Sequence, residues 1–406
     1  MAVADEAPPS AHRGERRVTP DPRPGDDGGN DLLASGVVTD AAVPAGWQRW
    51  LRRGLLTAWL AAIVAYLLVE GVPVDRETII AFTVAGLLAG SLGRRPLRGV
   101  LVDWLPFVAV LVVYDYTRGI ADLLGSPTEW MFQIDVDRFL GHGVVPTTWL
   151  QEHLKQAKPP DWEVAVSLVY ISFYFVPYLV AGWLWLRGRR DFRQFALRFV
   201  LLSFLGVIWF VAMPAAPPWA AAQCHTAQVA THPSAPACLD ENDPTGADDN
   251  GLLGAYRSDT DDKSQSVDRI SSRGFASLHL KNAQELLDKG QASVNLVAAV
   301  PSLHAATTLM LALFLWPRVR RRWRPLLVAY PLAMAFTLVY SAEHYVTDIL
   351  IGWALALALE GVVRWVGRVR STRRRADVDA VGGRDTAAGS TVTSRGVVGS
   401  GARETT

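Results

Sequence analysis

Long apolar stretches separated by short polar segments dominate the chain between residues 54 and 366. A helix that crosses a bilayer needs roughly 20 predominantly apolar residues, and eight stretches approach that length. They fall at about 54–71, 76–92, 99–118, 163–186, 194–213, 297–317, 325–342 and 346–366. The pattern predicts an all-α fold, a polytopic membrane helix bundle of about eight transmembrane helices.

Both ends of the chain lack such stretches. Residues 1–46 are rich in Pro, Gly, Asp and Arg and contain no apolar core of the length a signal peptide needs. Residues 369–406 are rich in Gly, Ser, Thr and Arg and have too few large apolar groups to form a packed core. We therefore expect two disordered tails around a membrane domain at 47–368, with one long loop at 214–296.

Composition supports a bilayer as the solvent, because 50% of the residues are hydrophobic and only 19% are charged. The formal net charge is +1. Basic residues gather in short runs between the apolar stretches rather than along one face, so they indicate membrane topology and no nucleic-acid partner.

The basic runs also predict the orientation. They lie at 47–53, 94–98, 187–193, 318–324 and 368–375, all on one side of an eight-span arrangement. Because basic connections stay on the cytoplasmic side, we expect a multi-pass cell-membrane protein with both termini in the cytoplasm. The longer polar connections, 119–162 and 214–296, then lie on the opposite side.

The long outer loop holds the two cysteines of the chain, Cys224 and Cys238. An oxidising exterior permits a disulfide, and closing a loop of about 15 residues contributes on the order of 3 kcal/mol. Two unpaired thiols remain the alternative.

One chemically distinctive segment is Pro301-Ser302-Leu303-His304, at the outer end of the sixth span. Proline suits the first turn of a helix, and the backbone N–H groups that follow it form an anion site together with the helix dipole. Ser302 can add a hydroxyl donor. His304 lies on the same turn, where it can give a proton to an oxygen that leaves phosphorus.

The second segment is His344-Tyr345-Val346-Thr347-Asp348, between the seventh and eighth spans. The i, i+4 spacing predicts that His344 and Asp348 share a helical face. A carboxylate bound to one ring nitrogen fixes the tautomer and directs the other lone pair outward, as a histidine nucleophile requires.

Each segment alone has a structural alternative. A histidine near the membrane surface is often an interfacial side chain, and Asp348 can cap the eighth helix or face water. The two segments together favour function, because polar groups beside apolar membrane helices are costly and usually have a purpose.

The runs PSLHAATTLM and AEHYVTDILIG resemble two signatures of the type 2 phosphatidic acid phosphatase superfamily. The likeness covers roughly residues 95–365 and is closest to the branch of inositol phosphorylceramide and sphingomyelin synthases. The resemblance implies that His344 is the nucleophile, that Asp348 orients it, and that His304 is the general acid and base.

The chain departs from the superfamily in its cationic residues. The phosphatases carry a KxxxxxxRP signature, which we do not find, and an arginine six residues before the second histidine, where this chain has Leu338. Another cation must bind the phosphate. The candidates on the outer side are Arg118, Arg257, Arg269 and Arg273, and the alternative for each is an ordinary solvated arginine.

The sequence therefore predicts a lipid phosphotransferase or phosphatase, an inositolphosphotransferase in the favoured case, that acts through a phosphohistidine at the non-cytoplasmic face. The expected partner is a membrane lipid with a phospholipid or polyprenyl phosphate head group. No cofactor and no metal is implied, because His225, His232 and His279 lack a regular ligand spacing. A non-catalytic lipid binder, a lipid transporter and a membrane scaffold are the alternatives. Transfer versus hydrolysis and the oligomeric state stay open.

An amphipathic stretch from Trp130 to Trp149 precedes the fourth span. Its Trp and Phe side chains suit the head-group depth of a bilayer, which favours an interfacial segment. Shaping lipid entry is one interpretation of this segment, and a plain connecting helix is the one we favour.

Overall fold

The computed structural model describes residues 46–70, 76–92, 97–123, 127–234, 236–239, 250–254, 267–277 and 299–390. Within these ranges the chain is helical, and the one β-bridge pairs Glu129 with Ala215. The longer helices are α1 (Gly46–Val69), α2 (Arg76–Ser91), α3 (Leu97–Leu123), α6 (Glu163–Arg187), α7 (Arg189–Ala212), α12 (Leu303–Leu315), α13 (Arg324–Tyr340) and α14 (Val346–Ser390). The all-α prediction is confirmed.

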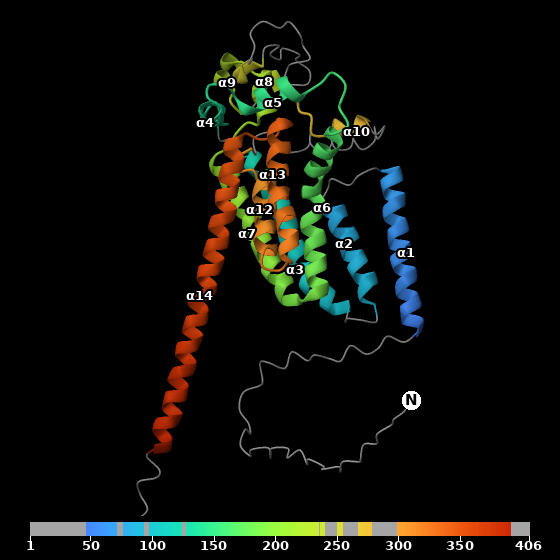
Figure 1. Ribbon diagram of the computed structural model, residues 1–406, viewed down its shortest axis with the longest axis vertical. Coiled ribbons are helices and arrows are strands. Elements are labelled where there is room, and N and C mark those ends of the chain that lie inside the picture. Colours follow the sequence, from blue (N-terminus) through green and yellow to red (C-terminus); the bar gives the residue numbers. More distant parts are fainter. Residues whose placement is uncertain are drawn as a thin grey trace, which may run out of the picture. The chain divides into compact units, whose positions relative to one another are not determined.

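Short helices lie in the connections on one side of the bundle. They are α4 (Phe132–Leu140), α5 (Pro146–Leu154), α8 (Pro218–Gln223), α9 (Thr226–Thr231), η1 (Ala237–Leu239), η2 (Gly251–Leu253) and α10 (Gly274–Ser277), and η4 (Arg321–Trp323) precedes α13 at the other end. Figure 1 shows α4, α5, α8 and α9 grouped beyond the ends of α6 and α13. The amphipathic stretch that begins at Trp130 contains two helices, α4 and α5, with a turn at Gly141–Gly143 between them.

Five of the described helices, α1, α6, α7, α13 with its η4 turn, and α14, are long and apolar enough to cross a membrane. Two shorter apolar helices, α2 and α12, bring further apolar length. The chain is a multi-pass membrane protein, and the predicted count of about eight spans is not confirmed by the described helices. The predicted span at 297–317 is shorter in the structure because α12 begins only at Leu303, after the capping residue Ser302.

Helix α12 lies at the centre of the bundle, in contact with α6, α7, α13 and α14. It has few polar side chains and buries most of its residues, as a helix surrounded by other helices must. Large apolar side chains on the outer helices remain exposed instead, for example Leu179 of α6, Ile208 of α7 and Leu357 of α14. These side chains form the surface that a bilayer would cover.

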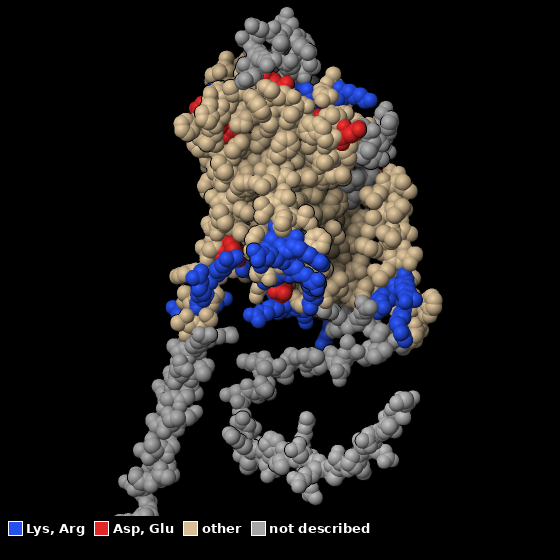
Figure 2. Space-filling view, viewed as in Figure 1, with Lys and Arg blue, Asp and Glu red and all other residues tan. Residues whose placement is uncertain are grey.

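The two ends of the bundle differ in charge. Arg and Lys side chains gather at one end, near the start of α1 and the connection between α12 and α13, as Figure 2 shows. The opposite end carries the short helices. This asymmetry follows the basic runs of the sequence.

The structure describes only part of the two predicted tails. Residues 1–45 and 391–406 lie outside the described residues. Helix α14 continues to Ser390, so 369–390 is helical where composition predicts no folded structure. A helix satisfies its own backbone hydrogen bonds and needs no packed core for that.

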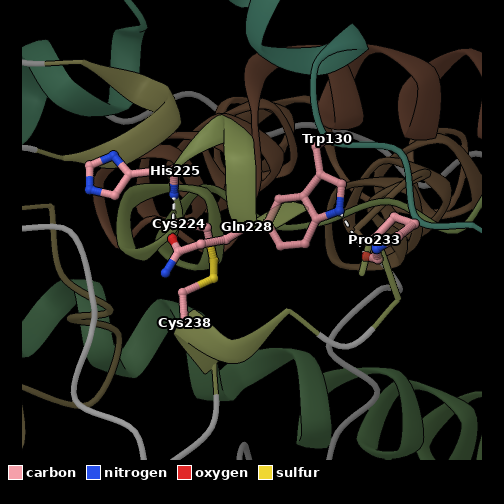
Figure 3. The surroundings of a disulfide bond; sticks show 6 residues. All are labelled: Trp130, Cys224, His225, Gln228, Pro233 and Cys238. Atoms are coloured by element: carbon pink, nitrogen blue, oxygen red, sulfur yellow. Dashed lines mark hydrogen bonds between the residues drawn. A yellow bond between two sulfur atoms is a disulfide. The ribbon is translucent and has the colours of Figure 1, made fainter. Parts of the chain in front are cut away.

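Cys224 and Cys238 form a disulfide that joins the end of α8 to η1. Both cysteines are buried in an apolar cluster with Trp130, Ala221 and Tyr345. Figure 3 shows Trp130 beside the bridge, with its indole N–H donating to the carbonyl of Pro233 at 2.9 Å.

We expect the double variant Cys224→Ser, Cys238→Ser to unfold more easily, by about 3 kcal/mol, because the unfolded chain is then no longer constrained by the closed loop. Thermal unfolding in detergent with and without reductant measures this difference. The reductant should lower the Tm of the wild type toward that of the variant and leave the variant unchanged. Equal Tm values for wild type and variant would contradict a stabilising bridge.

Candidate active site

His304 and His344 meet at the end of the bundle that carries the short helices. Their ring centroids are 5.7 Å apart. His304 is the second residue of α12, and His344 lies two residues before α14 begins. The two segments, 40 residues apart in sequence, thus share one site.

Direct backbone contact holds the N-termini of α12 and α14 together. The N–H of Ser302 donates to the carbonyl of Asp348 at 3.1 Å. Gly352 allows this approach, since a Cβ there would lie 2.5 Å from the carbonyl oxygen of Ser302. The Ser302 hydroxyl is fully buried and caps α12 by accepting from the N–H of Ala305 at 3.3 Å. Ser302 therefore fixes the beginning of α12 beside that of α14.

His344 pairs with Asp348 across the beginning of α14. Nδ1 of His344 lies 3.4 Å from Oδ2 of Asp348, and the same oxygen accepts the N–H of Tyr345 at 2.9 Å. The sequence predicted a shared helical face, whereas His344 in fact precedes the helix, so the pair is formed through the N-terminal cap. Asp348 is fully buried, so its carboxylate interacts with the imidazole and not with water.

The turn that carries His344 is strained and firmly held. Ala342 has a φ of 59°, a left-handed conformation that costs roughly 1–2 kcal/mol for a residue with a Cβ. Its carbonyl accepts the N–H of Trp219 from α8 at 3.1 Å, and the N–H groups of Glu343 and His344 both donate to the carbonyl of Leu338. The disulfide-linked helix α8 thus touches the turn that carries His344 directly.

Three aromatic side chains of α6 surround His304. The ring of Phe173 lies 3.9 Å from the imidazole, that of Tyr170 stacks on it at 5.2 Å, and that of Tyr174 lies at 6.1 Å. These contacts fix the plane of the imidazole and exclude water from one side of it.

Arg269 is the predicted cation that reaches this neighbourhood. Its Nε and Nη2 donate to Glu343, the residue before His344, at 2.9 and 3.0 Å. Its guanidinium lies 5.2 Å from the ring of Trp219, and Tyr170 is within its electrostatic reach. Burial disfavours the charged form of Arg269, and Glu343 more than offsets this, so the pKa of Arg269 is raised.

The other predicted arginines are placed differently. Arg273 forms an ion pair with Glu163 at 2.9 Å, and Glu163 also accepts the hydroxyl of Tyr340 at 2.7 Å. Arg257 lies outside the described residues. Arg118 falls in α3, where its side chain is likewise outside the described part of the chain.

Residues 267–274, which we call the strap, carry both Arg269 and Arg273 across the site. The N–H of Asp268 donates to Gln151 at 3.0 Å, and the N–H of Ile270 donates to the carbonyl of Ser341 at 3.3 Å. At its end Gly274 lies against the backbone of Glu163, where a Cβ would be 2.2 Å from the carbonyl oxygen. The backbone of the strap fixes Arg269 through contacts with α5 and with the turn that carries His344.

Asp137 of α4 caps the beginning of α14 from a distant part of the chain. Its carboxylate accepts the N–H groups of Val346 and Thr347 at 2.9 and 2.8 Å and the Thr347 hydroxyl at 2.6 Å. Burial raises the pKa of Asp137, although the bonds from Thr347 and Val346 oppose the shift.

We expect Asp137→Ala to destabilise the fold by roughly 1–2 kcal/mol and to lower turnover, because it removes the cap of the helix that holds Asp348. Asp137→Asn keeps one acceptor oxygen, so its stability and turnover should lie between those of the wild type and of Asp137→Ala. Thermal unfolding and activity measured on the same preparations check this order. An Asp137→Ala protein with wild-type stability would show that the cap contributes nothing.

Several residues around the site were missed by the sequence analysis, namely Asp137, Gln151, Glu163, Tyr170, Trp219 and Glu343. The sequence did give a reason to single out the acidic residues, since a carboxylate beside membrane helices generally has a partner. Their partners were not readable from spacing. In the described residues no group of three or more His, Cys, Asp and Glu side chains is arranged to hold a metal ion.

A buried histidine braced by a carboxylate and a second, partly exposed histidine lie together at the end of an apolar helix bundle, an arrangement suited to phosphoryl transfer in a membrane. The chain belongs to the PAP2 superfamily, whose sequence profile matches residues 134–361. It is therefore a membrane enzyme of the PAP2 type, and the matched region contains every residue of the site described above.

A named relative supports the synthase branch of that superfamily. The chain is similar to phosphoinositol dihydroceramide synthase of Bacteroides thetaiotaomicron, with 26% identity over 269 residues, which is 64% of this chain and 76% of the relative. No solved structure matches the chain.

Proposed function

We propose that the protein is a lipid phosphotransferase that moves a phosphoinositol group from an inositol phospholipid to a lipid alcohol through a phosphohistidine. The observation that carries this proposal is the 5.7 Å separation of the His304 and His344 rings, with Asp348 behind His344. Reacting atoms about 3–3.5 Å apart are close enough to react, so one phosphorus centre fits between the two imidazoles.

In the first half of the reaction, Nε2 of His344 attacks phosphorus. A nitrogen–phosphorus bond forms, the bond from phosphorus to the diacylglycerol oxygen breaks, and His304 gives its proton to that oxygen. Asp348 holds the proton on Nδ1 of His344 and stabilises the positive charge that develops on the ring.

In the second half, His304 takes the proton of the acceptor alcohol. The alcohol oxygen attacks phosphorus, the nitrogen–phosphorus bond breaks, and His344 returns to its neutral form. Arg269 stabilises the charge on the non-bridging phosphate oxygens in both halves. Water in place of the alcohol would give hydrolysis by the same residues.

For the topology, we propose that both termini are cytoplasmic and that the active site faces the exterior. The gathering of basic side chains at the opposite end of the bundle supports this orientation (Figure 2). The disulfide lies at the same end as the histidines, which suits an oxidising exterior. In this orientation the expected localisation is the cell membrane.

The test is to incubate purified protein with a ceramide or diacylglycerol acceptor and a panel of phosphoinositol, phosphoglycerol and polyprenyl phosphate lipids. Mass spectrometry of the products should reveal a new phosphoinositol lipid and free diacylglycerol. A phosphoinositol head group released into water would indicate hydrolysis. Absence of any product from every lipid of the panel would contradict the proposal.

A further inference from the structure

The cation at the candidate active site is neutralised by a neighbouring carboxylate. Glu343 is buried, with 7% of its surface exposed, and binds Arg269 through both oxygens. It also accepts the hydroxyl of Ser271 at 2.6 Å. Three donors, two of them from the Arg269 guanidinium, hold this carboxylate in place. The negative charge of Glu343 is thus a fixed part of the site, one residue from His344.

The other charges near the strap are also paired. Lys155 binds Asp268 at 2.7 Å, and Arg273 binds Glu163 at 2.9 Å. Among the described residues, Arg269 is therefore the arginine paired at the turn that carries His344, where the carboxylates of Glu343 and Asp348 oppose its charge. This balance suits a ligand of low charge.

Phosphate esters differ in the charge they bring to such a site. A phosphodiester carries one negative charge, whereas a phosphomonoester carries about 1.5 to 2 at pH 7, because its second pKa is about 6. A buried carboxylate repels the second charge, and like charges in one interface cost several kcal/mol. A site that binds phosphomonoesters well needs an excess of cations, which the Arg269–Glu343 pair does not provide.

We propose that Glu343 is a specificity-determining residue that makes the enzyme favour phosphodiester lipids over phosphomonoester lipids. Its carboxylate holds Arg269 in place and cancels the charge that a dianionic phosphate would require. This inference rests on the proposed function, since it presupposes that Arg269 and the two histidines bind the reacting phosphate.

The test compares phosphatidylinositol, a phosphodiester, with phosphatidic acid, a phosphomonoester, for the wild type and three variants. Glu343→Gln should raise the ratio of kcat/KM for phosphatidic acid over phosphatidylinositol by about tenfold or more, because the repulsion disappears. Ser271→Ala removes a hydrogen bond to Glu343 but keeps its charge, so the ratio should stay at the wild-type value. Glu163→Gln, a matched change in the pair with Arg273, should also keep the ratio.

A purely structural role for Glu343 would lower both activities in Glu343→Gln together and leave the ratio unchanged, which would overturn the inference. An equal rise of the ratio in Glu163→Gln would overturn it as well. A wild type that turns over neither lipid contradicts the proposed function itself. Turnover of phosphatidylinositol with an unchanged ratio in Glu343→Gln contradicts only the inference.

A second measurement needs no variant and is independent of folding defects. Methyl phosphate and dimethyl phosphate are compared as inhibitors of the wild type between about pH 6 and pH 8, where the monoester gains its second charge. Changes in the enzyme that affect both inhibitors equally cancel in the ratio of their inhibition constants. Methyl phosphate should weaken relative to dimethyl phosphate by about tenfold or more as the pH rises. A constant or opposite trend would overturn the inference.

Discussion

His344→Ala should abolish turnover while the protein remains folded. The substitution removes the nitrogen that attacks phosphorus, and loss of a nucleophile typically costs about 10³-fold or more in rate. Activity is measured on the lipid substrate that the panel identifies, and circular dichroism and thermal unfolding in detergent check the fold. His232→Ala, a change at an exposed residue at the end of α9, is the matched control and should behave as the wild type.

The covalent intermediate offers a second measure of the same prediction. Donor lipid labelled with phosphorus-32 should leave label on the wild type after denaturation at neutral pH, and acid should release it. His344→Ala should carry no label. Label of equal amount on His344→Ala would falsify the assignment of His344 as nucleophile and direct attention to another side chain.

Removal of Arg269 should lower turnover by about 10²–10³-fold, the usual effect of losing a group that stabilises the developing charge. Arg269→Ala alone would leave Glu343 buried without its partner, which destabilises proteins by about 3–5 kcal/mol. The decisive variant is therefore Arg269→Ala combined with Glu343→Gln, whose rate is compared with that of Glu343→Gln alone.

Arg269→Lys and added guanidinium ion separate charge from packing. Lysine keeps the charge but lacks the planar pair of donors, so it should restore only part of the rate. Guanidinium ion should raise the rate of the double variant and leave that of Glu343→Gln unchanged. If the double variant were as active as Glu343→Gln, the phosphate would have to be bound by a different cation.

Sequence patterns predicted the helix bundle well because each membrane helix must satisfy its own backbone in an apolar solvent. They also predicted that two segments 40 residues apart would share a surface, and the structure joins Ser302 to Asp348. The number of spans was less predictable. Helix α12 is short because its Ser302 cap is set by contact with α14, which the hydropathy of the segment does not report.

The surroundings of the histidines were beyond the sequence pattern. Spacing relates residues within one helix, whereas Glu343 meets Arg269 from a strap 74 positions earlier and Asp137 reaches Thr347 across 210 positions. The position usually occupied by arginine is Leu338 here, buried among Ala305 and Met334. Arg269 of the strap is instead the arginine paired beside the turn that carries His344, a contact that only the tertiary structure reveals.

The backbone hydrogen bond between Ser302 and Asp348 joins the beginnings of α12 and α14. These helix ends and the two imidazoles beside them therefore form one rigid unit. Tilting of the peripheral helices, or a thicker or thinner bilayer, would carry this unit along without changing its internal spacing. Host membranes of different thickness should thus alter how readily a lipid reaches the site more than how fast the phosphorus bond is exchanged.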